Sequence, residues 1–136
     1  MRHRRGVSLL LSRAGPSIIA NVSSGGAFVP QVFAPTYSAC KAAIHSYTMV
    51  LREALAKTSC QVVEIIPPAV QTNLGGAAPH GASLDEFCDT VVDGLVAGRQ
   101  RIGFGFTEDD TFVAAEKPYM ELFKQSAERA DVAGYR

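Results

Sequence analysis

A tyrosine and a lysine four residues apart, Tyr37 and Lys41, are the side chains of this sequence best suited to acid–base chemistry. On an α-helix this spacing places two side chains about 40° apart around the axis, so both point the same way. A lysine ammonium group beside a phenol favours the phenolate and lowers the tyrosine pKa from its reference value of about 10. Such a tyrosine can exchange a proton near neutral pH. The hydroxyl of Ser24, thirteen residues earlier, could then hold the reacting oxygen.

The segments around these side chains predict alternating strands and helices. The nearly continuous apolar run over residues 17–23 is typical of a buried parallel strand. Residues 36–57 give the clearest helix pattern, with Thr36 as the expected cap. A second strand is expected over residues 61–66, where Pro67 ends it. A strand, a helix and a strand of these lengths indicate a βαβ crossover.

The remainder of the chain predicts a loop, two more helices and a third strand. Residues 84–97 follow Ser83 in a capping-box pattern that begins a helix. Residues 101–106 predict the third strand, and residues 117–130 an amphipathic terminal helix. The expected fold class is therefore α/β, a partial doubly wound, Rossmann-like parallel sheet of about three strands with flanking helices. We expect a single domain over residues 1–136.

Composition limits the classes of partner and the compartment. The net charge is zero, which gives no indication of nucleic acid or an anionic membrane as a partner. No apolar stretch approaches the roughly 20 residues of a membrane span. Cys40, Cys60 and Cys88 are widely spaced and odd in number, which favours the cytoplasm and no disulfide framework. No paired cysteine or histidine motif predicts a metal site. The basic residues 1–5 are interpreted as a helix end, with a targeting segment as the alternative.

Three segments resemble the short-chain dehydrogenase/reductase family. The matching segments are Ile18 to Ser24 (IIANVSS), Tyr37 to Lys41 (YSACK) and Pro67 to Thr72 (PPAVQT). The resemblance implies hydride transfer between NAD or NADP and a carbonyl/alcohol pair, with Ser24, Tyr37 and Lys41 catalytic. For the same residues, the residue types alone are also consistent with a capping serine and a surface tyrosine–lysine pair.

The family resemblance also implies roles for individual residues. Tyr37 would exchange the proton, Lys41 would lower its pKa and hold the cofactor ribose, and Ser24 would bind the substrate oxygen. The family has a glycine at the position of Pro68, and this variant is similar to a small branch of oxidoreductases that includes those linked to D-alanylation of lipoteichoic acid. The residues expected to contact the cofactor are Tyr37, Lys41, Pro67, Pro68, Ala69, Val70 and Thr72.

Family members begin with a strand, a Gly-rich phosphate loop and a helix. No Gly-x-x-x-Gly-x-Gly pattern precedes Ser24, and only 23 residues come before it. The resemblance therefore predicts the C-terminal half of such an enzyme, with an exposed first strand and weak or no cofactor binding alone. We also expect a homo-oligomer, or pairing through the helix over residues 36–57. The alternatives are a non-enzymatic module that docks this helix on a full-length relative, and a truncated gene fragment.

Apolar residues on two loops suggest the chemical class of the substrate. Neither loop carries an arginine or lysine that could bind an anionic group, so we expect a small, neutral, hydrophobic carbonyl or alcohol. Packing is the alternative role for the first loop. His45 has no serine or cysteine partner in the sequence and is interpreted as a solvent or packing histidine. The loop residues are Phe28, Val29, Val32 and Phe33 before the tyrosine, and Ala77, Ala78 and His80 after the Pro-Pro segment.

Overall fold

A three-stranded parallel sheet lies at the centre of the computed structural model, which describes residues 15–74 and 80–129. The strands β1 (Ser17–Val22), β2 (Cys60–Ile66) and β3 (Arg101–Gly103) lie in the order β1-β2-β3. Six of the seven residues of β2 are buried, as in a central parallel strand. The prediction of a buried strand over residues 17–23 is wrong for β1, whose six residues alternate between half-buried and exposed because β1 lies at the edge of the sheet. The sheet and its flanking helices confirm the expected Rossmann-like α/β fold.

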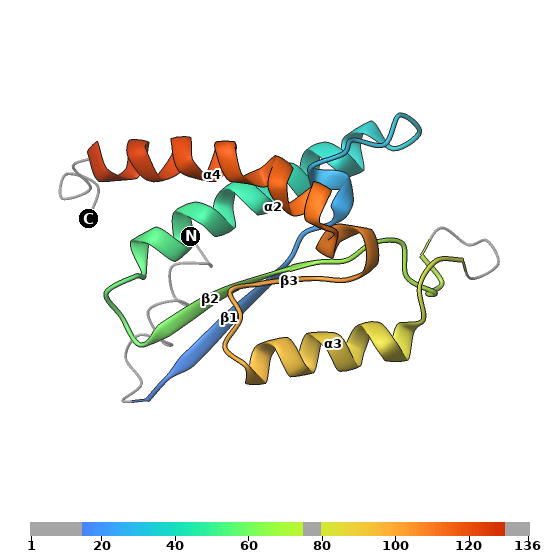
Figure 1. Cartoon of the computed structure of the whole chain (residues 1–136), viewed down its shortest axis with the longest axis horizontal. Helices are drawn as coiled ribbons and strands as arrows, with labels where there is room; N and C mark the ends of the chain where they lie inside the picture. Colours follow the sequence, from blue (N-terminus) through green and yellow to red (C-terminus); the bar gives the residue numbers. More distant parts are fainter. Residues whose placement is uncertain (1–14, 75–79, 130–136) are drawn as a thin grey trace.

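Helices cover both faces of the sheet (Figure 1). Helix α2 (Pro35–Ala54) and helix α4 (Asp110–Arg129) lie on one face, and α3 (Leu84–Val96) lies on the other. Two 3-10 helices, η1 (Gly25–Ala27) and η2 (Gly105–Glu108), follow β1 and β3. Within the described residues, no helix is both long enough and apolar enough to cross a membrane.

The face under α3 holds an apolar core. Val63, Ile65 and Ile102 are buried there, and Phe87, Val91 and Leu95 of α3 pack against them. Val63 and Ile102 are fully buried. Burial at about 25 cal/mol per Å² of apolar surface makes this contact a principal source of stability.

Helix α4 is fixed to the sheet by charged side chains. Arg101 of β3 donates hydrogen bonds to both carboxylate oxygens of Glu116, at 2.7 and 2.9 Å. It also donates to Glu108 at 2.8 Å, and Arg99 pairs with the same carboxylate. The aromatic ring of Phe112 packs edge-on against Phe28, at 5.3 Å between centroids. These contacts hold α4 above α2 and the loop that follows β1.

The third strand ends earlier than predicted, and the helix expected over residues 36–57 runs over Pro35–Ala54. The third strand ends at Gly103 because Gly105 adopts a positive φ of 55° and begins a tight turn. The Phe104 amide donates to Thr107 Oγ1 at 2.9 Å within this turn, which replaces strand pairing. Helix α2 begins at Pro35 rather than after a cap at Thr36, since a proline is well suited to the first helical position.

The terminal helix is longer than predicted, and several expectations fall on residues that are not described. Helix α4 begins at Asp110, seven residues before the predicted start at residue 117, and Pro118 lies inside it. The capping serine of α3 is as predicted, because Ser83 Oγ accepts a hydrogen bond from the Glu86 amide. The basic residues 1–5 and the loop residues Ala77 and Ala78 lie outside the described residues.

Candidate active site

Ser24 lies just beyond the carboxyl end of β1, where its side chain caps η1. Its Oγ accepts a hydrogen bond from the Gly26 amide at 3.1 Å. Because the hydroxyl oxygen is the acceptor in this contact, its own proton stays available for donation to another group. Ser24 is buried, which restricts the positions that its side chain can take.

Lys41 lies one turn after Tyr37 on α2, and its ammonium group faces the end of β1. Lys41 Nζ donates to the Val22 carbonyl oxygen at 3.0 Å and lies 5.6 Å from the centroid of the Tyr37 ring. This contact uses one of the three N–H donors of the ammonium group. The lysine is therefore held against both the tyrosine and the strand that leads to Ser24.

Ser24 and Tyr37 lie on either side of Gly26. A Cβ atom built on Gly26 would lie 3.5 Å from Ser24 Oγ and 3.6 Å from Tyr37 Cε1. The serine hydroxyl and one edge of the phenol ring thus converge on the same small region. The structure therefore brings together the three side chains that the sequence singles out for chemistry.

The segment from Pro67 to Thr72 begins beside this site and then pairs with the segment that precedes α3. The Gly25 amide donates to the Pro67 carbonyl oxygen at 3.0 Å, which joins the serine loop to the end of β2. Val70 forms an isolated parallel bridge with Ala82, and Thr72 is exposed. Pro67 thus lies next to the serine loop, whereas the residues after Pro68 are held against the segment that precedes α3 (Figure 1).

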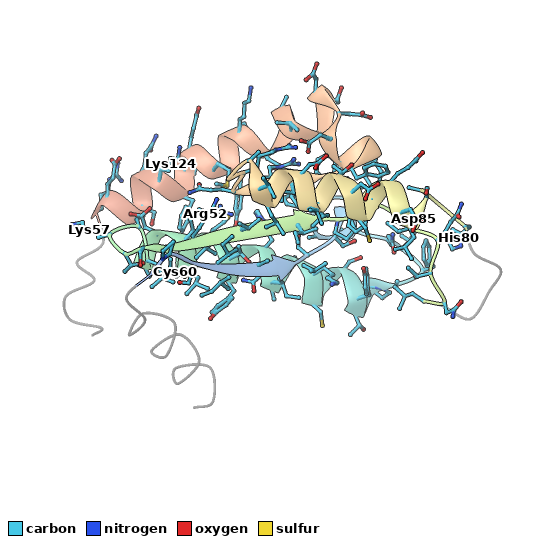
Figure 2. The ribbon with its side chains drawn as sticks, turned by 90° about the horizontal axis from the view of Figure 1, so that it is seen from below. Arg52, Lys57, Cys60, His80, Asp85 and Lys124 are labelled. Atoms are coloured by element: carbon cyan, nitrogen blue, oxygen red, sulfur yellow. The ribbon has the colours of Figure 1, made fainter. Side chains whose placement is uncertain are left out.

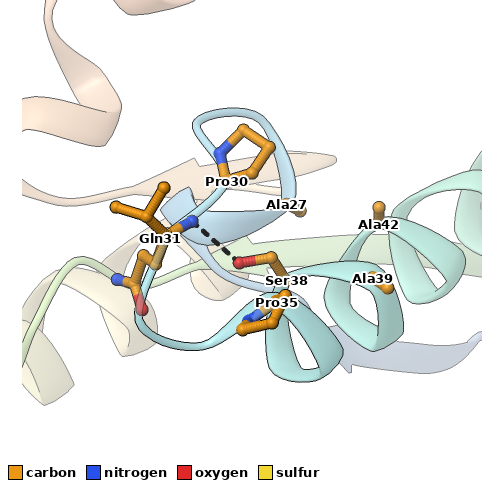
Figure 3. Close-up of a pocket in the computed structure, with 8 residues that line it drawn as sticks. Ala27, Pro30, Gln31, Pro35, Ser38, Ala39 and Ala42 are labelled. Carbon is orange, nitrogen blue, oxygen red and sulfur yellow. Dashed lines mark hydrogen bonds between the residues drawn. The ribbon is translucent and has the colours of Figure 1, made fainter.

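A shallow apolar hollow of about 400 Å³ lies between the loop after η1 and the start of α2 (Figure 3). Its lining includes Pro30, Val32, Ala39 and Ala42. On the helix, the two alanines lie about 100–160° around the axis from the tyrosine–lysine pair. The hollow therefore opens on a different side of α2 from Tyr37 and Lys41.

The other loop residues expected around a substrate have different surroundings. Phe28 packs edge-on against His45 at 4.5 Å between ring centroids, which is the packing role considered for this loop. Val32 is 98% exposed and Phe33 is 83% exposed. His80 is exposed and lies with Asp85 at the end of the sheet where α3 begins (Figure 2).

A polar stripe along the sheet-facing side of α2 was not recognised from the sequence. It consists of Lys41, His45, Thr48 and Arg52, spaced at i, i+4, i+7 and i+11. His45 is buried, as the packing interpretation expects, but its Nδ1 also lies 2.9 Å from both carboxylate oxygens of Glu64. The signal in the sequence was this helical spacing, together with a single glutamate inside the apolar run of β2.

Arg52 is the last residue of this polar stripe and lies near the end of α2 (Figure 2). It donates to the carbonyl oxygens of Val62 at 3.1 Å and Gln100 at 2.9 Å. Burial lowers the pKa of the Arg52 guanidinium, and the nearby charge of Glu64 offsets part of this shift. Within residues 15–74 and 80–129, no cluster of three or more histidine, cysteine or carboxylate side chains could hold a metal ion.

Curated proteins share this sequence pattern over part of their length. The DltE protein of Bacillus subtilis (strain 168), described as an uncharacterized oxidoreductase, is 38% identical over 99 residues, or 68% of this chain and 39% of that protein. Estradiol 17-beta-dehydrogenase 2 of Rattus norvegicus is 41% identical over 71 residues, or 52% of this chain and 19% of that protein. The chain thus spans less than half the length of either relative.

Solved structures share the fold at low sequence identity. A short-chain dehydrogenase from Sphingobium yanoikuyae, in complex with NADPH, has a TM-score of 0.68 at 21% identity over 79% of this chain and 44% of that one. A bulky-bulky ketone specific alcohol dehydrogenase from Comamonas testosteroni has a TM-score of 0.65 at 19% identity, over 79% and 42%. A family model described as short chain dehydrogenase matches residues 4–82, which is more than half of the 136 residues. The chain therefore belongs to the short-chain dehydrogenase family.

Proposed function

We propose that this chain carries the proton-transfer residues of an NAD- or NADP-dependent oxidoreductase that acts on a carbonyl/alcohol pair. The observation that carries the proposal is the convergence of Ser24 Oγ and the Tyr37 ring beside Gly26. Lys41 Nζ lies close to the same ring, at 5.6 Å from its centroid. A phenol, an ammonium group and a free hydroxyl in one region form the set that a proton transfer to a carbonyl oxygen requires.

The proposal gives each of the three side chains a separate role in the proton transfer. Tyr37 donates its phenolic proton to the carbonyl oxygen during reduction and takes it back during oxidation. Ser24 donates a hydrogen bond to the same oxygen and thereby orients it toward the tyrosine. Lys41 places a positive charge beside the phenol, which favours the phenolate left after proton donation.

The donor groups in this region fit the nicotinamide end of a cofactor. Lys41 has two N–H donors beyond the one used at the Val22 carbonyl, and these suit the two hydroxyls of a ribose. When bound, NAD or NADP supplies or accepts the hydride. The Sphingobium structure is described as a complex with NADPH, which supports a cofactor of this class. The residues that would hold it are Tyr37, Lys41, Pro67, Pro68, Ala69, Val70 and Thr72.

The proposed substrate is small, neutral and hydrophobic. No arginine or lysine occurs in residues 28–35 or 73–82, so neither loop can bind a carboxylate or phosphate through a cation. One relative is named for estradiol and one fold neighbour for bulky ketones, which agrees with an apolar carbonyl or alcohol. We place the reaction in the cytoplasm, because the three cysteines are free thiols.

A direct test uses two proteins. Calorimetric titration of this chain with NADH and with NADPH measures cofactor binding, for which we expect weak or no signal. A fusion that places the N-terminal portion of the Bacillus subtilis relative ahead of this chain tests turnover with apolar ketones. In the fusion, Tyr37→Phe should lower kcat by about 10²-fold or more, since it removes the general acid.

Tyr47→Phe is the matched control, because Tyr47 lies on the same helix and is 50% exposed. It should leave kcat unchanged. Equal rates for Tyr37→Phe and the unaltered fusion would exclude Tyr37 as the acid. A strong preference for anionic substrates would exclude the proposed substrate class.

A second candidate function is supported by an apolar surface on α2. Tyr47 and Val50 of this helix are 50% and 54% exposed, which suits a contact with another subunit. In this alternative, the helix docks the chain on a full-length relative or on a second copy without catalysis. Tyr47→Glu should then abolish co-purification with that partner, whereas the oxidoreductase proposal alone predicts no such loss.

A further inference from the structure

Consecutive residues at the end of β1 are each bound to a neighbouring element. Asn21 Nδ2 donates to Thr48 Oγ1 of α2 at 3.0 Å, and the Val22 carbonyl accepts from Lys41 of α2 at 3.0 Å. Ser23 Oγ donates to Glu64 Oε1 of β2 at 2.6 Å. The next residue along the chain is Ser24. The contact of Ser23, the residue immediately before the candidate catalytic serine, is therefore the one that acts on Ser24 most directly.

The contact of Ser23 continues through Glu64 to the helix that carries Tyr37. Glu64 lies in the central strand and is 3% exposed, and its carboxylate also contacts His45 Nδ1 at 2.9 Å. A carboxylate can only accept hydrogen bonds, so the assigned network places a proton on Nδ1 of the imidazole. A buried carboxylate without such donors would be strongly unfavourable. The result is a continuous chain of hydrogen bonds from β1 through β2 to α2.

The surroundings of His45 exclude water from this chain. His45 is 7% exposed, with Phe28 edge-on at 4.5 Å and Tyr119 of α4 at 5.9 Å between ring centroids. Among the described residues, its Nε2 atom is buried without a hydrogen-bond partner. A low-dielectric environment strengthens the hydrogen bonds that are made, so these bonds restrain the relative positions of Ser23, Glu64 and His45.

We propose that Ser23, Glu64 and His45 form a positioning unit for Ser24 in the oxidoreductase reaction proposed above, on which this inference rests. Well-packed apolar residues often stabilise a core as well as a buried polar cluster does, so stability alone is a weak reason for this arrangement. This polar cluster differs from an apolar one because hydrogen bonds are directional. Its bonds of 2.6 and 2.9 Å fix the position of β1 relative to α2. That fixes Ser24 Oγ relative to Tyr37, where an error of about 1 Å can cost about 10²-fold in rate.

The first test needs no catalytic activity and uses this chain as it is. Amide hydrogen exchange is measured at Gly26, whose N–H donates to Ser24 Oγ. Ser23→Ala should accelerate exchange at Gly26 by about tenfold or more after correction for global stability, because the end of β1 becomes locally mobile. Thr48→Val is the matched control, since it removes the contact of Asn21 with α2, which lies two residues before Ser23 and is not part of the Ser23–Glu64–His45 chain. It should leave corrected exchange at Gly26 unchanged.

The second test separates positioning from packing in the catalytic fusion. Ser23→Ala should lower kcat by about 10-fold to 100-fold with little change in KM, while Thr48→Val should change neither. His45→Leu should behave like Ser23→Ala, and His45→Asn should restore much of the rate, because an asparagine amide can donate to Glu64 from a similar position. Rescue by asparagine would not be expected from a purely structural role.

The two tests distinguish the failure of this inference from the failure of the proposed function. Unchanged exchange at Gly26 in Ser23→Ala would overturn the positioning unit, whether or not the fusion is active. Equal effects of Ser23→Ala and Thr48→Val on kcat would also overturn it. Faster exchange at Gly26 in a fusion without any turnover would support the coupling of Ser23 to Ser24 and reject the oxidoreductase function instead.

Discussion

The two faces of the sheet are built by different interactions. On the α3 face, Val63, Ile65 and Ile102 meet the apolar side chains of the helix, without any directional contact between the helix and the strands in this cluster. The α2 face also has an apolar cluster, in which Leu51 packs with Val62. It differs in that polar side chains of the helix also bind the strands, through Thr48, His45 and the buried carboxylate of Glu64. Over β2 both faces are well buried, so the contrast there lies in how position is specified rather than in how much surface is removed from water.

The difference between the two faces corresponds to the presence of candidate catalytic residues on α2 and not on α3. Apolar contacts are non-directional, and their contribution depends mainly on the area that they bury. Hydrogen bonds restrict distance and angle, so they set the register of a helix on a sheet. Helix α2 carries Tyr37 and Lys41, whose positions must be accurate for proton transfer, whereas α3 carries no candidate catalytic residue. Directional contacts are thus concentrated where a small displacement would affect chemistry.

The largest effect on stability is expected from the apolar face. Ile102→Ala removes a side chain that is 0% exposed from the centre of the α3 core. Such truncations cost about 2–5 kcal/mol, through lost burial and the cavity left behind. Urea unfolding followed by circular dichroism measures this loss. Ile18→Ala, at a side chain that is 49% exposed, is the control and should cost much less. A loss below about 1 kcal/mol for Ile102→Ala would show that this face is loosely packed.

The next largest effect on stability is expected from a substitution of Arg52, which tests the polar contacts of the α2 face. Arg52→Met keeps an apolar stem of similar length but removes donors to the Val62 and Gln100 carbonyls. Hydrogen bonds to charged groups contribute about 1.5–3 kcal/mol, so we expect a loss of that size in the free energy of unfolding. Lys57→Met, at an exposed lysine near the same helix end, is the matched control and should change stability by less than about 0.5 kcal/mol. Equal losses in the two variants would contradict a specific role for the half-buried Arg52.

A third prediction tests how closely α3 packs on the sheet. A Cβ atom on Gly94 would lie 2.8 Å from Ile102 Cδ1 and 2.9 Å from Cγ1. Gly94→Ala should therefore cost about 1–3 kcal/mol by overpacking, despite the better helix propensity of alanine. Ile102→Val removes Cδ1, so the double variant should be less destabilised than the sum of the two single changes. Strict additivity in this double-mutant cycle would show that α3 shifts to accommodate the methyl group.

Apolar periodicity and spacing predicted the fold well, because these patterns report burial directly. The strand over residues 61–66 and the helix over 84–97 appear within one residue of β2 and α3. Errors occur where a local contact overrides the pattern. Pro118 lies inside α4, although a proline usually disfavours a helix interior, and this obscured the first turns of the helix. Phe112, in the first turn of α4, packs against the ring of Phe28, which is distant in the sequence, and a local pattern cannot reveal such a contact.

The site was predictable where the residues are close in sequence. The spacing of Tyr37 and Lys41 sets their relation on one helix, and the loop length brings Ser24 to them. The contacts of His45 with Glu64 and of Ser23 with the same carboxylate join residues 19 and 41 positions apart. Such pairs depend on strand register, which the sequence of one chain does not specify for a polar pair inside an apolar strand.

The smallest effect on monomer stability is expected from a substitution on β1, the edge strand of the sheet. Register pairs Ile18 with Gln61 and Val22 with Ile65, so both side chains lie on the α3 side of the sheet, where they are 49% and 47% exposed. Among the described residues, β1 pairs only with β2, which leaves its other edge open. An open apolar edge favours association between chains.

Ile18→Lys should therefore change the free energy of unfolding by less than about 0.5 kcal/mol while it reduces self-association, because a charged side chain on an edge strand opposes pairing. Light scattering over a range of concentrations measures the association, and Ile18→Val, which keeps an apolar side chain, is the control. A clean monomer at every concentration in the unaltered chain would show that this edge does not mediate association. A large loss of stability in Ile18→Lys would place Ile18 in the α3 core, and the contrast between a covered β2 and an open β1 would then be wrong.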